Sequence, residues 1–297
     1  MALDAFITYL DSERNYATHT LEAYKVDMLQ FKSFLKLVRH NKKIETAQFS
    51  DVRAWVVSLV NKKMHPTTVN RKIATLKSYY RFLQKIGEIE TNPAQAQKRL
   101  KQEKKARIPF SYKEIAAALD LFQDANTFEA LRDKLLITLL YSTGIRRNEL
   151  IELKLTQVSV ASKQIKVLGK RNKERIVPLL DAVLPEIETY LHARSEIVKP
   201  EGVPYFFLTK KGFKMYPSLV YRIVKLYFSK VSEKVKKSPH ILRHSFATHL
   251  LEQGAHINAV KELLGHASLQ ATQLYTHADM SYLKEVCRHS HPRNQKQ

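Results

Sequence analysis

The feature that most constrains the fold is an apolar stripe near the start of the chain. Leu21, Tyr24, Met28, Phe31 and Leu35 recur at steps of 3, 4, 3 and 4 residues. That spacing follows one face of an α-helix, whereas a half-buried strand would alternate every second residue. Similar stripes over residues 3–10, 52–59 and 69–83 predict three further helices. Residues 1–90 are therefore expected to form a helical domain.

The charge of the chain points to a polyanionic partner. Its 297 residues include 50 Lys+Arg against 28 Asp+Glu, which gives a net charge of +22. Residues 1–106 contribute +10 (20 minus 10), so residues 107–297 contribute the other +12. Because both parts are basic, the composition favours a protein that encloses nucleic acid. The alternative is a ribosome-associated or merely soluble basic protein.

Cysteine usage and hydropathy limit the cellular setting. Cys287 is the only cysteine, so the chain has neither a disulfide framework nor a Cys-x-x-Cys zinc pattern. The N-terminus does not read as a signal peptide, and no apolar run approaches the roughly 18 residues of a membrane span. We therefore expect a cytoplasmic protein that contacts no membrane.

Two basic regions are candidates for contact with phosphate. The fourth predicted helix carries Arg71, Lys72, Lys77 and Arg81 on one face, which is either a solvated surface or a phosphate-binding one. A predicted linker at residues 91–109 begins near Asn92-Pro93 and closes at Pro109. Its basic residues, Lys104 and Lys105 among them, suit either a disordered tether or a segment that lies along a DNA backbone; we favour the second.

Residues 110–297 are expected to form a second, mostly helical domain with a small sheet. The capping box Ser111-x-x-Glu114 opens it, and an apolar helix over residues 131–141 stops at Gly144. The β-prone runs 164–169 and 175–179 flank a basic tip and predict a hairpin. The further predicted helices are 217–231, 242–252, 257–264 and 281–288. The fold class is therefore mainly α with a small β-sheet (α+β).

The last quarter of the chain carries residues suited to phosphodiester chemistry. His240, Arg243, His266 and Tyr275 follow one another, and a guanidinium fork matches two phosphate oxygens. A second arginine follows the helix stop at Gly144, where position alone does not decide between residues 146 and 147. Zinc at the histidines is disfavoured because no Glu or Cys joins them at ligand spacing. We expect no metal and no cofactor.

Several ordered motifs resemble the tyrosine recombinase, or phage-integrase, family over essentially the whole chain. Within that family the chain is most similar to the bacterial Xer recombinases. The segments that carry the resemblance are TGIRRNEL at 143–150, GKRNKERIVP at 169–178, HILRHSFATH at 240–249, LLGH at 263–266, YTH at 275–277 and HPR at 291–293. The resemblance implies an N-terminal SAM-like domain that binds core DNA, followed by a catalytic domain of the DNA breaking-rejoining fold.

The resemblance also implies the roles of the site residues. Tyr275 would be the nucleophile that forms a 3′-phosphotyrosyl link. The other implied catalytic residues are Arg146, Lys170, His240, Arg243 and His266. The two arginines would hold the non-bridging oxygens, the histidines would assist proton transfer, and Lys170 would protonate the leaving 5′-oxygen. Glu149 matches an acidic position after the first arginine and would orient the site without touching the DNA.

One departure leaves the proton donor open. Arg171 stands where the family usually has a glycine after the lysine, so Lys173 is the alternative to Lys170. Both Arg171 and Lys173 are also candidates for DNA contact.

The implied partners are double-stranded DNA with a specific site and a tetramer, formed alone or with a second related recombinase. A C-terminal helix would dock on a neighbouring protomer, and a septal DNA translocase would be the regulator. Residues 281–288 are either that helix or a helix packed on its own domain. The implied cellular role is chromosome dimer resolution and segregation at cell division. Alternatives are an integrase or transposase of a mobile element, a type IB topoisomerase, or a non-catalytic DNA-binding relative.

Overall fold

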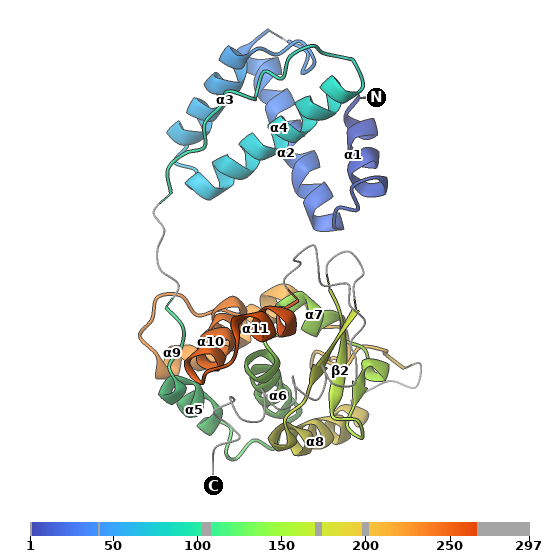
Figure 1. The fold of residues 1–297 in the computed structure, drawn as a ribbon, viewed down its shortest axis with the longest axis vertical. Coiled ribbons are helices and arrows are strands. Elements are labelled where there is room, and N and C mark those ends of the chain that lie inside the picture. Colours follow the sequence, from blue (N-terminus) through green and yellow to red (C-terminus); the bar gives the residue numbers. More distant parts are fainter. Residues whose placement is uncertain (1, 41, 103–107, 170–173, 198–201, 266–297) are drawn as a thin grey trace. The chain divides into compact units, whose positions relative to one another are not determined.

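The computed structural model describes residues 2–40, 42–102, 108–169, 174–197 and 202–265. The chain divides into two compact units, Met1–Lys105 and Ala106–Gln297 (Figure 1). Each unit has its own hydrophobic core. In the described ranges, the helices are all too short or too polar to cross a membrane.

The described part of the first unit is built from the helices that the apolar stripes predict. They are α1 (Ala2–Ser12), α2 (Thr18–Val38), α3 (Phe49–Asn61) and α4 (Pro66–Lys85). Met28, Phe31 and Leu35 from the opening stripe are fully buried. The helix α4 packs against α1, α2 and α3, because its own buried face is wide.

Part of the predicted linker lies against α4. Ala94 is fully buried, and the side chain of Asn70 bonds to both main-chain groups of Leu100 at 2.7 and 3.0 Å. Lys77 also donates to the carbonyl of Gln95 at 3.0 Å. The first unit therefore extends through this stretch, whereas Lys104 and Lys105 lie outside the described residues.

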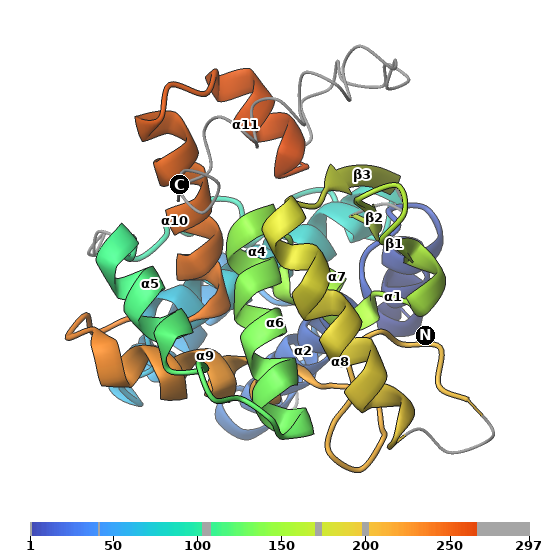
Figure 2. The same cartoon turned by 90° about the horizontal axis from the view of Figure 1, so that it is seen from below.

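The second unit surrounds one buried helix, α6 (Phe128–Thr143), which Figure 2 shows near the middle of the unit. The other helices are α5 (Tyr112–Asp120), α7 (Arg147–Glu152), α8 (Leu184–Ser195), α9 (Pro217–Val231), α10 (Pro239–Glu252) and α11 (Ile257–Leu263). Short 3-10 turns occupy η1 (Leu155–Gln157) and η3 (Asp181–Val183). Most of α6 is buried, so it lacks the one-sided apolar stripe of a surface helix.

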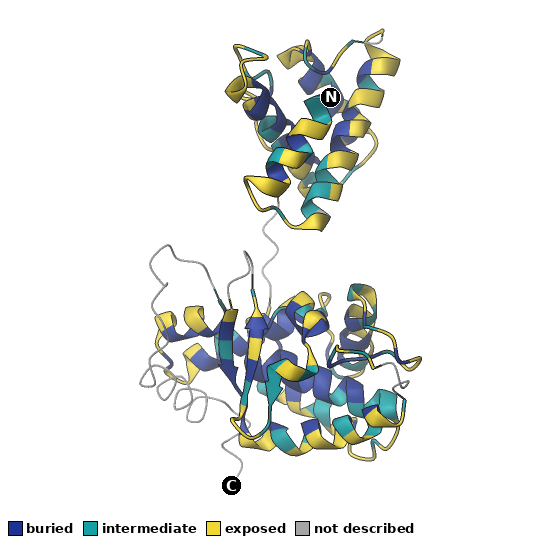
Figure 3. Cartoon of the chain, turned by 90° about the vertical axis from the view of Figure 1, so that its right-hand side faces the viewer, coloured by how far each residue is buried: buried dark blue, intermediate teal, exposed yellow. Residues whose placement is uncertain are grey.

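The described sheet is antiparallel, in the order β1 (Val158–Ser159), β2 (Gln164–Leu168) and β3 (Glu174–Pro178). In β2, Ile165 and Val167 are buried, and Lys166 between them is exposed. Figure 3 shows buried and exposed positions along the strands of the sheet. The β2–β3 pair is the predicted hairpin, and its last pairing is Leu168 with Glu174.

The predicted fold class is confirmed, mostly helical with a small sheet. The capping box is also present, since Ser111 N–H donates to Glu114 at 2.7 Å and the Ser111 hydroxyl accepts from Glu114 N–H at 3.3 Å. The sequence reasoning did not predict α7, α8 or β1, which are short or lack a clear apolar period. The predicted helix at 281–288 lies outside the described residues.

Candidate active site

The turn between α6 and α7 positions the first site arginine. Gly144 ends α6 in the left-handed conformation, with φ of 59°. A Cβ at this position would lie 2.3 Å from Cδ1 of Phe246, so a larger residue would have to displace that ring. The chain then turns sharply, and Arg146 becomes the residue that precedes α7.

Glu149 accepts two hydrogen bonds from Arg146, one from its main chain and one from its side chain. One carboxylate oxygen accepts the main-chain N–H of Arg146 at 2.7 Å, and the other accepts its Nη1 at 2.7 Å. The carboxylate also stands in the first turn of α7, where the helix dipole favours a negative charge. Glu149 therefore binds both the main chain and the side chain of Arg146.

Arg175 on β3 is a site residue whose role the sequence reasoning missed. Its Nη1 and Nη2 donate to the two carboxylate oxygens of Glu149 at 3.0 and 2.8 Å. Its Nε donates to the carbonyl of Leu263 at 3.1 Å. The signal was available, because Arg175 has the same strand phase as the buried Val177, and a charge in that phase needs a partner.

Arg243 enters from α10, one turn after His240. Its side chain is buried and donates to the carbonyls of Gly144 and Leu264. Burial and the nearby Arg146 guanidinium lower the pKa of Arg243 to about 10. The group is still cationic at neutral pH.

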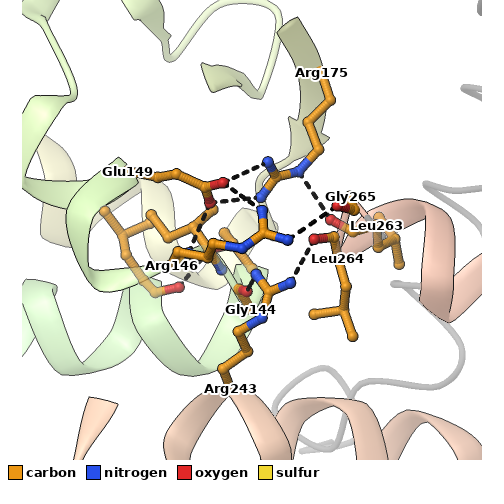
Figure 4. A network of polar contacts seen from close by, with 11 residues as sticks. Gly144, Arg146, Glu149, Arg175, Arg243, Leu263, Leu264 and Gly265 are labelled. Carbon is orange, nitrogen blue, oxygen red and sulfur yellow. Dashed lines mark hydrogen bonds and ion pairs between the residues drawn. The ribbon is translucent and has the colours of Figure 1, made fainter. Parts of the chain in front are cut away.

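The C-terminal end of α11 is held by all three arginines (Figure 4). Arg175 donates to Leu263 O, Arg243 to Leu264 O, and Arg146 to Gly265 O, the last at 3.0 Å. Carbonyls at a helix end have no partner within the helix, so the guanidinium groups satisfy them. The three arginines thus fix the last described residues of α11 and its end to the cluster.

The cluster carries excess positive charge, because three guanidinium groups surround one carboxylate. Burial alone would raise the pKa of Glu149, but hydrogen bonds and charge from Arg175, followed by bonds from Arg146, lower it to about 2. With Glu149 ionised, the four groups sum to +2. Such a site suits a phosphodiester, whose non-bridging oxygens accept from guanidinium forks.

The structure brings together Arg146, Glu149 and Arg243 from the predicted site. His240 is exposed in the first turn of α10. The catalytic candidates Lys170, His266 and Tyr275 lie outside the described residues, as do Arg171 and Lys173.

The basic face predicted on α4 needs one correction. Lys72 is only 2% exposed, and its ammonium bonds to Asp27 at 2.7 Å and to Gln30. A buried and paired ammonium is not available to a phosphate, so Lys72 is not a DNA-contact residue in this conformation. Arg71 is also paired with Asp27 but is half-exposed, and Arg81 is exposed.

Among the described residues, no group of three His, Cys, Asp or Glu side chains could hold a metal ion. His249, one of the histidines considered for zinc, is buried with its Nδ1 2.8 Å from the Tyr141 hydroxyl. Its ring stacks on Tyr112 at 3.8 Å between centroids. His249 therefore packs α10 against α5 and α6.

Two parts of the chain match family models. Residues 110–281 match the phage integrase family, and residues 3–87 match the N-terminal SAM-like domain of phage integrases. Together they define a class of two-domain proteins with an integrase catalytic domain. The chain belongs to the phage integrase family, the tyrosine recombinases, as its ordered motifs predicted.

Individual relatives cover nearly the whole chain. Tyrosine recombinase XerC of Chlorobaculum parvum is 35% identical over 98% of this chain and 94% of its own. XerC of Oceanobacillus iheyensis is 36% identical over 98% and 96%.

Solved structures show the same fold. XerH bound to palindromic difH substrate superposes with a TM-score of 0.69 at 23% identity, over 93% of this chain and 81% of that chain. The Tn1549 transposon integrase with right-end DNA also has a TM-score of 0.69, at 20% identity over 96% and 99%.

Proposed function

We propose that this chain is a site-specific recombinase that cuts and rejoins DNA through a 3′-phosphotyrosyl intermediate and a Holliday junction. The observation that carries the proposal is the convergence of Arg146 and Arg243 on one site with excess positive charge. Arg146 stands just before α7 and Arg243 is in α10, so the two arginines are distant in the sequence. Sequence motifs alone do not require that Arg146 and Arg243 lie close together in space.

The arginines would bind the scissile phosphate. In the structure Arg146 and Arg243 donate to the main-chain carbonyls of Gly144, Leu264 and Gly265. A phosphate oxygen is a stronger, charged acceptor for the same donors. Binding would therefore exchange neutral hydrogen bonds for charge-assisted ones, and the gain would grow as charge builds in the transition state.

Tyr275 would supply the attacking oxygen. Its Oη forms a bond to phosphorus while the bond from phosphorus to the 5′-oxygen breaks. Lys170, or Lys173 in its place, gives a proton to the leaving 5′-oxygen, and His240 and His266 assist the proton transfer from Tyr275. A 5′-hydroxyl then attacks the phosphotyrosine, and the reverse exchange rejoins the strand. One ester replaces another at each step, so neither ATP nor a metal is needed.

The cellular role we propose is chromosome dimer resolution and segregation at cell division, in the cytoplasm. Its support is the similarity to relatives named XerC. The partners would be double-stranded DNA, a tetramer formed alone or with a second related recombinase, and a septal DNA translocase as regulator. An integrase or transposase of a mobile element is the alternative.

A suicide DNA substrate, nicked close to the cleavage position, tests the chemistry. Wild-type protein should form a covalent adduct with the 3′ end, both with and without EDTA. Tyr275→Phe should form none while it binds the same DNA, because only the attacking oxygen is missing. An undiminished adduct in Tyr275→Phe would disprove the assignment of the nucleophile.

Genome-wide recovery of cleaved DNA tests the cellular role. Fragments bound covalently by the protein in its own cells are sequenced. One chromosomal site away from mobile genes supports dimer resolution, whereas sites at the ends of a mobile element favour the alternative.

A further inference from the structure

Arg175 joins three elements at the candidate active site. It stands on β3, binds both oxygens of Glu149 on α7, and donates through Nε to the carbonyl of Leu263 at the end of α11. Its side chain is 6% exposed, and its guanidinium lies beside that of Arg146 at the carboxylate of Glu149 (Figure 4). All three types of donor on this guanidinium are thus used by protein acceptors.

The charge balance shows what Arg175 does for Arg146. With Arg175 present, the carboxylate of Glu149 is shared between two guanidinium groups. Without it, Arg146 and Glu149 would form a neutral pair, and the excess charge of the cluster would fall from +2 to +1. Arg146 would then be held more tightly by Glu149 and be a poorer donor to a phosphate.

The end of α11 is shaped to fit Arg175. Gly265 has φ of 63°, and a Cβ there would lie 3.1 Å from Nη1 and 3.2 Å from Cδ of Arg175. The glycine lets the main chain pass close to the guanidinium side chain. Residue 263 precedes His266 by three positions and Tyr275 by twelve. Arg175 therefore fixes both Glu149 and the start of the segment that carries the proposed nucleophile.

We propose that Arg175 is a positioning residue for strand cleavage, which holds Glu149 and the α11 end so that Arg146 can engage the scissile phosphate. This inference rests on the proposed recombinase function. Arg175 does not touch the DNA in this role; it acts through Glu149 and Leu263.

Two variants and a matched control test the role. Arg175→Met removes the charge, and Arg175→Lys keeps a charge but loses the fork that binds both oxygens. Arg194→Met is the control, because Arg194 is also a buried arginine of this unit and bonds only to carbonyls, those of Val203, Tyr205 and Phe206. It should lose stability in the same way without disturbing Arg146.

The first readout is the rate of adduct formation on the suicide substrate at several pH values. We expect Arg175→Met to slow cleavage about 100-fold, Arg175→Lys to restore part of the rate, and DNA affinity to change little. The defect of Arg175→Met relative to wild type should shrink toward acid pH, because loss of the Arg175 cation raises the pKa of Glu149. A protonated Glu149 would no longer pair with Arg146 as an ion, so the excess charge of the cluster would return to +2.

The groups that face Glu149 support this expectation. Arg146 stands just before α7, the helix of Glu149; Arg175 comes from β3, and Arg243 adds charge from α10. On α9, which packs against α7, Arg222, Lys225 and Lys230 are exposed. An equal rate loss and an equal pH profile in Arg194→Met would mean that Arg175 is merely structural, and would overturn the proposal.

The second readout does not depend on catalysis. The guanidinium protons of Arg146, assigned in nitrogen-15 spectra by their absence in Arg146→Lys, should shift and exchange more slowly in Arg175→Met but not in Arg194→Met. Unchanged Arg146 signals in Arg175→Met would overturn the positioning role, whether or not the protein cleaves DNA. If wild type forms no adduct on any DNA, the proposed function fails, and the Arg146 signals still decide whether Arg175 positions it. If Arg175→Met does not fold, Arg175→Lys takes its place in both readouts.

Discussion

Each unit of the molecule contains a buried carboxylate bound by two basic side chains. In the first unit, Asp27 on α2 is fully buried and pairs with Arg71 and Lys72 on α4. In the second, Glu149 pairs with Arg146 and Arg175. Both networks contain one buried cation and one that is partly exposed.

The surroundings of the two networks differ. The basic partners of Asp27 are neighbours on one helix, and Thr75 from the same helix adds a hydrogen bond at 2.9 Å. The partners of Glu149 come from different elements, and Arg243 adds a third cation. The Asp27 network sums to +1, with both cations on one helix, and it serves packing between two helices. The Glu149 network sums to +2, with its cations drawn from separate parts of the chain, and that larger surplus creates a site for an anion.

The largest expected effect is in the first unit. Asp27→Ala should destabilise it by about 3–5 kcal/mol, because Lys72 would be left buried without a counter-charge. Urea denaturation measures the loss. Asp51→Ala is the control, since its partners Arg39 and Lys42 have 39% and 29% exposed side chains and can turn to water. An equal loss in both variants would show that the burial of Lys72 does not matter.

The contribution of Glu149 to the unfolding free energy should depend on pH. The pKa of Glu149 is lowered from 4.5 to about 2 in the folded state. Stability from a lowered pKa is present above the unfolded value and is lost as the pH falls through the folded value, here on the order of 3 kcal/mol. The difference in unfolding free energy between wild type and Glu149→Gln should therefore shrink as the pH falls from about 5 toward 2.

Glu114 also has a lowered pKa, but it does not affect the difference between wild type and Glu149→Gln. Hydrogen bonds from Lys234, Ser232 and Ser111 outweigh burial and also bring the pKa of Glu114 to about 2. Both proteins retain Glu114, so its contribution cancels in the difference. A difference that stays constant over the whole range would contradict the assigned role of Glu149.

Sequence reasoning could predict what depends on local pattern. The apolar stripes gave the helices of the first unit, and Gly144 marked the end of α6. The position of Arg146 followed from its offset from that glycine together with the family motif. Pairings across the chain were out of reach, because the bonds from Arg175 to Glu149 and Leu263 join residues far apart. The same limit explains Lys72, whose place in the basic stripe of α4 gave no sign of Asp27.

The glycine turn beside the active site should tolerate little change. Gly144→Ala should cost about 2 kcal/mol, from the left-handed backbone and from the displaced ring of Phe246. Gly254→Ala is the matched control, because Gly254 has φ of 86° but nothing within 4 Å of the added carbon. Thermal unfolding of the two variants isolates the contacts of the added carbon with Phe246 and with Cδ2 of Leu264, which would lie 2.9 Å away. Equal melting temperatures would mean that the ring moves aside without cost.

The smallest effect distinguishes the two cations that bind Asp27. The side chain of Arg71 is 42% exposed, so Arg71→Ala should cost only about 0.5–1 kcal/mol of stability. If Arg71 contacts phosphate, the same variant should reduce the slope of log affinity against log salt by about 1. Lys72→Met should leave that slope unchanged, because in the wild type the Lys72 ammonium stays paired with Asp27 and does not reach the DNA. A reduced slope in Lys72→Met would mean that DNA draws Lys72 out of the core, and the network of the first unit would then be functional as well.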